Sequence, residues 1–138
     1  MYEAIKDLAM EEQVEKIART LVSVKSVNGT DGEVNMANQL EAILRSFPYF
    51  AQHPEQVWTQ PLEGDKLGRK NVFALLEGSN EENKTIIYHG HMDTVGIDDF
   101  GSLEAHALDP DYLQRYFSKY EKDSDVQKDA ASGEWLFG

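Results

Sequence analysis

Hydrophobic residues recur at helical spacing in two successive stretches near the start of the chain. The first stretch predicts an amphipathic helix over residues 11–24. The second predicts a helix over residues 30–47, because Thr30 and Glu33 have the spacing of a capping box and Pro48 stops the pattern. Two consecutive amphipathic helices indicate a helical layer that covers a sheet.

Three further stretches have the patterns of β-strands, separated by polar turns at residues 64–68 and 81–83. Residues 56–62 alternate in part, whereas residues 71–76 and 85–91 are near-continuous apolar runs, as expected of strands covered on both faces. Helices together with buried strands predict an α/β fold in which the helices pack on a mixed, largely buried β-sheet. Sites in such folds lie at the carboxyl ends of strands.

The stretch over residues 96–132 is acidic and poor in aliphatic residues, as in an inserted loop region. It contains one predicted helix, residues 110–120, which Asp109 and a proline in the first turn would start. An apolar stripe on this helix is formed by Tyr112, Leu113, Tyr116, Phe117 and Tyr120. Connections of this length are typical of functional or mobile segments. Residues 134–138 then have the pattern of another strand's beginning.

The chain has 138 residues, a formal net charge of −12 and no cysteine. Its length predicts one domain or a piece of a larger one. An acidic surface repels nucleic acid and anionic lipid, so we expect neither nucleic acid nor membrane as a partner. Without cysteine, any metal must be held by His, Asp, Glu and water. The sequence shows no secretory signal and no membrane-spanning stretch, which predicts a cytoplasmic protein.

Three polar residues, His89, His91 and Asp93, occupy alternate positions where the apolar run over residues 85–91 ends. Alternate residues of a strand share a face, so we expect these side chains to project together. An imidazole offers a nitrogen lone pair to a divalent metal, and a neighbouring carboxylate holds the ring in one tautomer or binds the metal itself. The pattern favours a metal-dependent hydrolase.

The residues around His91 resemble the first metal-site motif of the M20 metallopeptidases, the group of aminoacylases, carboxypeptidases and succinyl-diaminopimelate desuccinylases. The motif spans residues 86–95, Ile-Ile-Tyr-His-Gly-His-Met-Asp-Thr-Val. Further stretches that are similar to family segments, in the same order, are residues 21–29, 68–74 and 132–138. Residues 96–101 and the long insert after them most resemble the arginine-utilization branch.

The resemblance implies a phosphorylase/hydrolase-like fold of the zinc-peptidase type and a two-zinc site that hydrolyses amide bonds of small peptides or acylated amino acids. By analogy His91 is a zinc ligand, and Asp93 is the catalytic residue that orients its ring. The family's other ligands and its base glutamate have no counterpart up to Gly138. Residues 1–138 are therefore expected to be the amino-terminal portion of a catalytic domain, without the dimerisation domain. One histidine cannot hold zinc at catalytic affinity, so we expect this chain by itself to be inactive and to bind no zinc.

Two other functions fit parts of the sequence. His89, His91 and Asp93 begin the His-x-His-x-Asp-His motif of metallo-β-lactamases, although Thr94 replaces the last histidine and the preceding chain is helical. A non-catalytic interaction module would instead use the acidic insert and its aromatic stripe as a partner surface. For His89, a hydrogen-bonded position in the core is favoured over a ligand role, and His106 is expected at the surface.

Overall fold

The computed structural model describes residues 1–79 and 84–138, so the turn expected at residues 81–83 lies outside the described residues. The described residues combine helices with a small antiparallel sheet, an α/β arrangement. The elements in chain order are the 3₁₀ helix η1 (Tyr2–Ala4), α1 (Met10–Val22), α2 (Gly32–Arg45), α3 (Pro48–Gln52), η2 (Pro54–Gln56), β1 (Val57–Pro61), β2 (Lys70–Ala74), η3 (Asp98–His106), α4 (Pro110–Phe117) and α5 (Ser124–Ser132).

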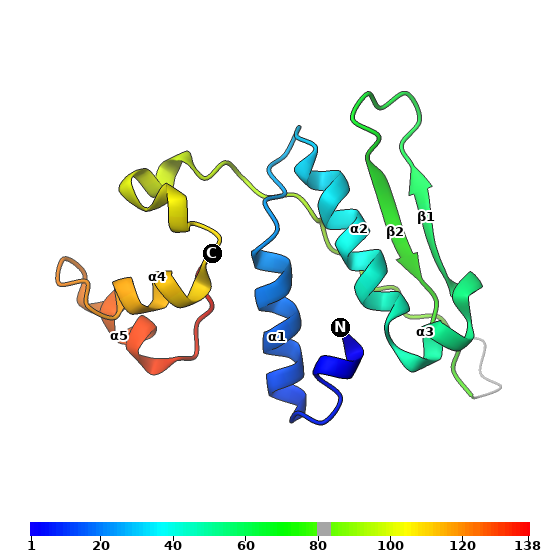
Figure 1. The fold of residues 1–138 in the computed structure, drawn as a ribbon, viewed down its shortest axis with the longest axis horizontal. Helices are drawn as coiled ribbons and strands as arrows, with labels where there is room; N and C mark the ends of the chain where they lie inside the picture. Colours follow the sequence, from blue (N-terminus) through cyan, green and yellow to red (C-terminus); the bar gives the residue numbers. More distant parts are fainter. Residues whose placement is uncertain (80–83) are drawn as a thin grey trace.

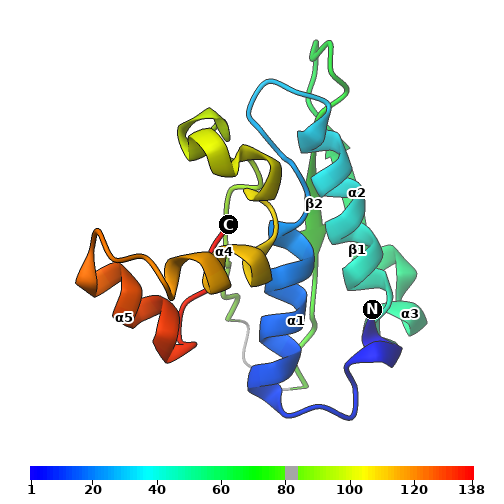
Figure 2. The same ribbon diagram turned by 60° about the vertical axis from the view of Figure 1, so that its left-hand side comes forward.

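Helix α1 lies between the other parts of the molecule. Figure 1 shows α2 and the hairpin of β1 and β2 on one side of α1, and α4 and α5 on the other. Figure 2 shows the same order after rotation. An ion pair of 2.8 Å between Arg19 and Asp111 joins α1 to α4. Among the described residues, no helix has both the length and the apolar character needed to cross a membrane.

Helices α1 and α2 confirm the two predicted helices to within two residues at each end. The start of α2 differs in detail from a capping box. The Thr30 hydroxyl accepts a hydrogen bond from the Gly32 N–H (3.2 Å), and the Glu33 carboxylate accepts one from the Gly29 N–H (2.8 Å). A Cβ at Gly32 would lie 1.9 Å from the Lys25 carbonyl oxygen, so this position requires glycine. The segment after α1 can therefore lie directly against the start of α2.

The hairpin of β1 and β2 confirms two predicted strands and corrects the predicted sheet. Val57 lies opposite Ala74, and α2 packs on the face where Val57 is buried. The other face presents Trp58 and Phe73, which stack at 5.3 Å and remain 43% and 37% exposed. In the described residues the sheet is thus two-stranded, antiparallel and open on one face, rather than mixed and largely buried.

Residues 85–91 do not form the strand that their apolar run predicts. Ile86, Ile87 and Tyr88 are 76%, 85% and 90% exposed. A strand needs a neighbour to take its backbone hydrogen bonds, and no described residue provides backbone pairing for this run. The apolar pattern indicates a segment suited to burial, but it carries no information on which polypeptide buries it.

Helix α4 confirms the start of the helix predicted over residues 110–120, but it ends at Phe117, three residues earlier than predicted. The Asp109 carboxylate caps it by accepting a hydrogen bond from the Tyr112 N–H at 2.9 Å. Leu113 is fully buried, so the predicted apolar stripe packs against the chain's own residues at this point. His106 is half-buried rather than at the surface, because its ring stacks on Tyr112 with centroids 3.5 Å apart.

The acidic stretch holds more helix than its sequence pattern predicts. Helix α5 begins where the Asp123 carboxylate accepts hydrogen bonds from two backbone amides of the first turn, and it ends at Gly133, whose φ is 74°. Both capping residues can be recognised in the sequence. Ala130 is the one buried residue of α5, so this helix lacks the repeat of apolar positions from which a helix is predicted. The strand expected over residues 134–138 is not formed, and Phe137 instead stacks on Phe117.

Candidate functional site

A backbone bridge, rather than the end of a strand, places the residues that follow the apolar run. Val27 and Thr94 form an isolated parallel bridge. The Thr94 N–H donates to the Ser26 carbonyl (2.9 Å), and the Asn28 N–H donates to the Thr94 carbonyl (3.0 Å). The segment between α1 and α2 therefore holds the backbone just after Asp93 in a fixed position.

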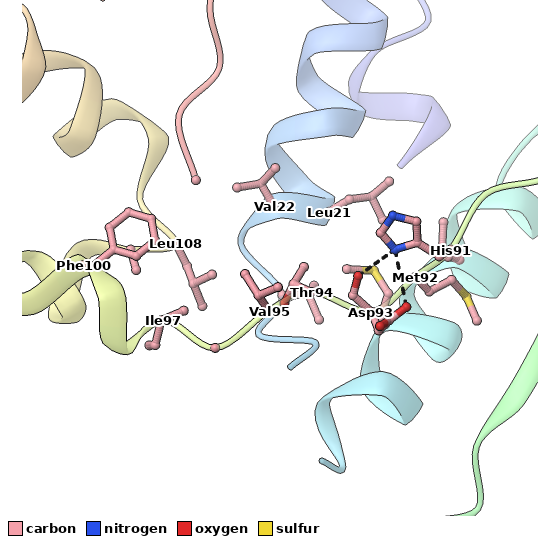
Figure 3. Close-up of a pocket in the computed structure, with 16 residues that line it drawn as sticks. Leu21, Val22, His91, Met92, Asp93, Thr94, Val95, Ile97, Phe100 and Leu108 are labelled. Carbon is pink, nitrogen blue, oxygen red and sulfur yellow. Dashed lines mark hydrogen bonds and ion pairs between the residues drawn. The ribbon is translucent and has the colours of Figure 1, made fainter. Parts of the chain in front are cut away.

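His91 and Asp93 contact each other, as the sequence predicts. The ring nitrogen Nδ1 of His91 lies 2.9 Å from the backbone carbonyl oxygen of Asp93 and 3.4 Å from its Oδ1. The carbonyl and the ionised carboxylate can only accept, so Nδ1 carries the ring proton. In the neutral ring Nε2 then keeps its lone pair, and this nitrogen points away from Asp93 (Figure 3). The His91 side chain is 84% exposed, which leaves Nε2 accessible to a ligand.

Asn28 belongs to the site, although the sequence pattern at this position predicts only a turn. Its amide Nδ2 donates to Asp93 Oδ2 at 2.8 Å, on the oxygen that His91 does not contact. This hydrogen bond is the main reason that the pKa of Asp93 lies below its usual range, followed by a backbone hydrogen bond and the charge of His91. The carboxylate therefore stays ionised and in place beside the ring.

The turn that carries Asn28 is itself supported by charged residues. The Glu33 carboxylate accepts the Gly29 N–H and also forms an ion pair of 3.3 Å with Arg69. Arg69 in turn forms a hydrogen-bonded ion pair of 2.7 Å with Asp65. The hairpin loop and α2 thus help to fix the position of Asn28. The Asn-Gly pair just before a capping motif is the sequence signal that could have identified it.

A cavity of about 350 Å³ adjoins the pair. Figure 3 shows His91 and Asp93 at one end of it and apolar side chains of α1, of the segment after Val95 and of the η3 region around the rest. His91 and Asp93 are the ionisable side chains in a lining that is otherwise mainly apolar. An imidazole beside an apolar cavity is suited to a ligand that combines a metal-binding or polar group with an apolar part.

His89 does not join this pair, contrary to the expectation that all three side chains project together. It lines a second cavity, between α2, β2, residues 87–90 and Met92, while His91 and Asp93 line the first. The expected core position is also wrong, because His89 is exposed. The physical reason is the missing strand pairing, since strict alternation holds only in a regular strand. This separation disfavours the His-x-His arrangement of the metallo-β-lactamase alternative.

The residues present fit one ligand position of a metal site and do not complete one. Within residues 1–79 and 84–138, no group of three or more His, Cys, Asp or Glu side chains comes together to hold a metal ion. Catalytic zinc sites use about three protein ligands, of which His91 could supply one. The geometry therefore defines a kind of site: a histidine whose ring is oriented by a carboxylate, at the edge of an apolar cavity.

Two curated proteins of Bacillus subtilis (strain 168) are similar to this chain. One is protein RocB, 48% identical over 137 residues, which cover 99% of this chain and 24% of RocB. The other is named uncharacterized protein YqjN and is 37% identical over 121 residues, 86% of this chain and 21% of YqjN. The chain therefore spans about a quarter of the length of the curated relatives it matches. No protein-family model and no solved structure matches it.

Proposed function

We propose that this chain forms part of a metal-dependent hydrolase that cleaves peptide or N-acyl amide bonds in the use of arginine or other amino acids. The proposal combines the M20-like motif around His91 with the similarity to protein RocB, which agrees with the arginine-utilization branch. The substrates would be small peptides or acylated amino acids. The chain by itself would be inactive.

The observation that carries the proposal is the orientation of one ring. The backbone carbonyl and the carboxylate of Asp93 contact Nδ1 of His91. Nε2 is therefore the ring nitrogen whose lone pair is available to bind a metal. Metal-binding histidines characteristically hydrogen-bond their second nitrogen in this way. Asp93 is itself held by a hydrogen bond from Asn28. An exposed histidine without a binding role does not require such support.

Zinc, when bound, would supply a Lewis acid that polarises the amide carbonyl. In this chain His91 would be the ligand, and Asp93 would position it and raise its basicity. The other ligands would come from polypeptide of the kind that makes up the remainder of the longer relatives. The adjoining apolar cavity would contact an apolar part of the substrate.

A chimera tests the proposal: this chain replaces the matched 137 residues of protein RocB. Zinc content is measured by elemental analysis, and amine release is measured on N-acyl amino acids and arginine-containing dipeptides. We expect zinc binding and hydrolysis, both reduced at least about 100-fold by His91→Ala and about 10- to 100-fold by Asp93→Asn.

His89→Ala is the matched control, because His89 is another exposed histidine of the same segment that lies outside the first cavity. It should leave zinc content and hydrolysis near the starting level. The hydrolase proposal is wrong if neither RocB nor the chimera releases amine, or if His91→Ala leaves both zinc and activity unchanged.

A further inference from the structure

The turn between α1 and α2 contains the one Asn-Gly pair of the chain, Asn28-Gly29. Each of the other five asparagines is followed by a residue with a side chain. An asparagine amide can be attacked by the backbone nitrogen of the next residue, and glycine leaves that nitrogen unshielded because it has no Cβ. Asn28 is therefore the asparagine whose sequence neighbour most favours the loss of its side-chain amide.

The local structure leaves this pair open to such a reaction. Asn28 and Gly29 lie in a turn and are exposed to solvent. The φ of Gly29 is 77°, and a Cβ built there would meet no atom within 4 Å, so the turn has room for a ring to form. Asn38, by contrast, is exposed on α2, where helical hydrogen bonds hold the backbone nitrogen of the following residue.

Three hydrogen bonds hold the pair in place. The Asn28 amide Nδ2 donates to Asp93 Oδ2 (2.8 Å), and the Asn28 backbone N–H donates to the Thr94 carbonyl (3.0 Å). The Gly29 N–H donates to the Glu33 carboxylate (2.8 Å). The two bonds to carboxylates are exposed, and an exposed hydrogen bond opens readily, so each slows an attack of Gly29 on Asn28 by about tenfold at most.

We infer that Asn28 is a site of spontaneous deamidation, and that this modification removes the support of the His91–Asp93 pair. The Gly29 nitrogen loses its proton and attacks Cγ of Asn28, which forms a carbon–nitrogen bond. The bond from Cγ to Nδ2 breaks, and Nδ2 takes up a proton and leaves as ammonia. Water then hydrolyses the cyclic imide at one of its two carbonyls, which gives aspartate or isoaspartate at position 28. Water is the one co-reactant that the conversion consumes.

Either product disturbs the candidate site. A carboxylate can only accept hydrogen bonds, so the bond that Asn28 donates to Asp93 is lost, and two like charges face each other instead. Isoaspartate also adds a methylene group to the backbone between positions 28 and 29, directly beside the bridge of Val27 with Thr94. The fixed position of Asp93, and with it the orientation of the His91 ring, is therefore lost as Asn28 is converted.

Peptide mass spectrometry of the purified chain, kept at mildly alkaline pH, tests the inference by following each asparagine with time. Position 28 should be converted at least about tenfold faster than Asn38, which the helix protects. Glu33→Ala should speed this conversion about three- to tenfold, because it frees the Gly29 N–H. Glu63→Ala is the matched control, because Glu63 is exposed and makes none of the three hydrogen bonds, and it should leave the rate unchanged.

The state of the His91 ring gives a second readout. In ¹⁵N NMR spectra, the ring should be protonated at Nδ1 in the intact chain. It should lose this fixed tautomer in the converted protein and in Asn28→Asp, which supplies the aspartate product in pure form. The inference is wrong if position 28 keeps its amide as long as Asn38 does, if folded Glu33→Ala does not lose it faster, or if Asn28→Asp leaves the ring unaltered. Neither readout needs zinc or hydrolysis, so this inference and the proposed hydrolase activity are tested separately.

Discussion

At the scale of single residues, the arrangement around Asp93 shows how few contacts define the candidate site. One oxygen of the carboxylate accepts a hydrogen bond from the Asn28 amide, and the other contacts the His91 ring. The backbone carbonyl of the same residue holds the ring nitrogen. One residue thus fixes both the tautomer and the orientation of the imidazole, which is what a metal ligand needs before the metal arrives.

Replacing Asn28 tests this arrangement through the pKa of Asp93. Because the Asn28 amide is the main cause of the low pKa, Asn28→Ala should raise the pKa of Asp93 towards the ordinary carboxyl range. Carboxyl ¹³C NMR titration of the chain measures this directly. Asn38→Ala, at an exposed asparagine of α2, is the control and should leave the pKa of Asp93 unaltered. An unchanged Asp93 pKa in Asn28→Ala would show that the hydrogen bond is not formed in solution.

The same shift has a defined consequence for stability against pH. A carboxyl group whose folded pKa is lowered stabilises the fold above its unfolded pKa, about 4. That contribution is lost as the pH falls through the lower folded value. Glu41 and Asp65 have lowered pKa values as well, chiefly through hydrogen bonds from Arg45 and Arg69 respectively, so they act in the same direction. Chemical denaturation should therefore show falling stability below about pH 4, with a smaller Asp93 contribution in Asn28→Ala.

At the scale of elements, the helices are set by local signals and the strands by their neighbours. Helix α4 begins at a cap formed by Asp109, and its Leu113 side chain is buried against the rest of the chain. Residues 85–91 have stronger strand propensity than β1, but they pair with no strand that the structure describes. A helix satisfies its backbone hydrogen bonds internally, whereas a strand depends on another strand.

Truncation of Leu113 tests whether α4 docks as described. The side chain is fully buried, so Leu113→Ala should lower the free energy of unfolding by about 2–5 kcal/mol through lost burial and a residual cavity. Leu62→Ala is the control, because Leu62 is 41% exposed and should change stability by less than about 0.5 kcal/mol. Urea denaturation followed by circular dichroism measures both variants. Equal effects would mean that α4 is not packed on the rest of the chain.

At the scale of the whole molecule, charge opposes the compact state. The chain has 25 acidic and 13 basic residues, which gives the net charge of −12. Some ion pairs, such as Lys6 with Glu3, are solvent-exposed and contribute little to stability. The pairs of Arg69 with Asp65 and with Glu33, in contrast, are partly buried. Self-repulsion among the excess carboxylates acts against these pairs, and we expect it to be the larger of the two effects.

Salt should accordingly stabilise the chain. Raising sodium chloride from about 0.02 M to about 0.5 M shortens the Debye length to a few ångströms, which screens the long-range repulsion more than the short-range pairs. We expect the thermal unfolding midpoint to rise by a few degrees, measured by differential scanning fluorimetry near neutral pH. A matched series in which sucrose replaces salt controls for general solvent effects. A lower midpoint at high salt would mean that the ion pairs dominate.

The sequence by itself determined the helices α1, α2 and α4, the strands β1 and β2, and the pairing of His91 with Asp93. These depend on hydrophobic spacing, on caps such as Asp109, and on residues close together in the chain, so short-range physics suffices to predict them. The motif around His91 also predicts a histidine held by a carboxylate.

The tertiary structure alone decided which distant segments meet. It placed the Asn28 amide against Asp93 and separated His89 from His91. It also left residues 85–91 without a neighbouring strand among the residues that the structure describes. None of these follows from periodicity, because contacts between residues far apart in the chain depend on which surfaces are present to pack against one another. The burial that the apolar run is suited to requires a partner strand, and no described residue supplies it.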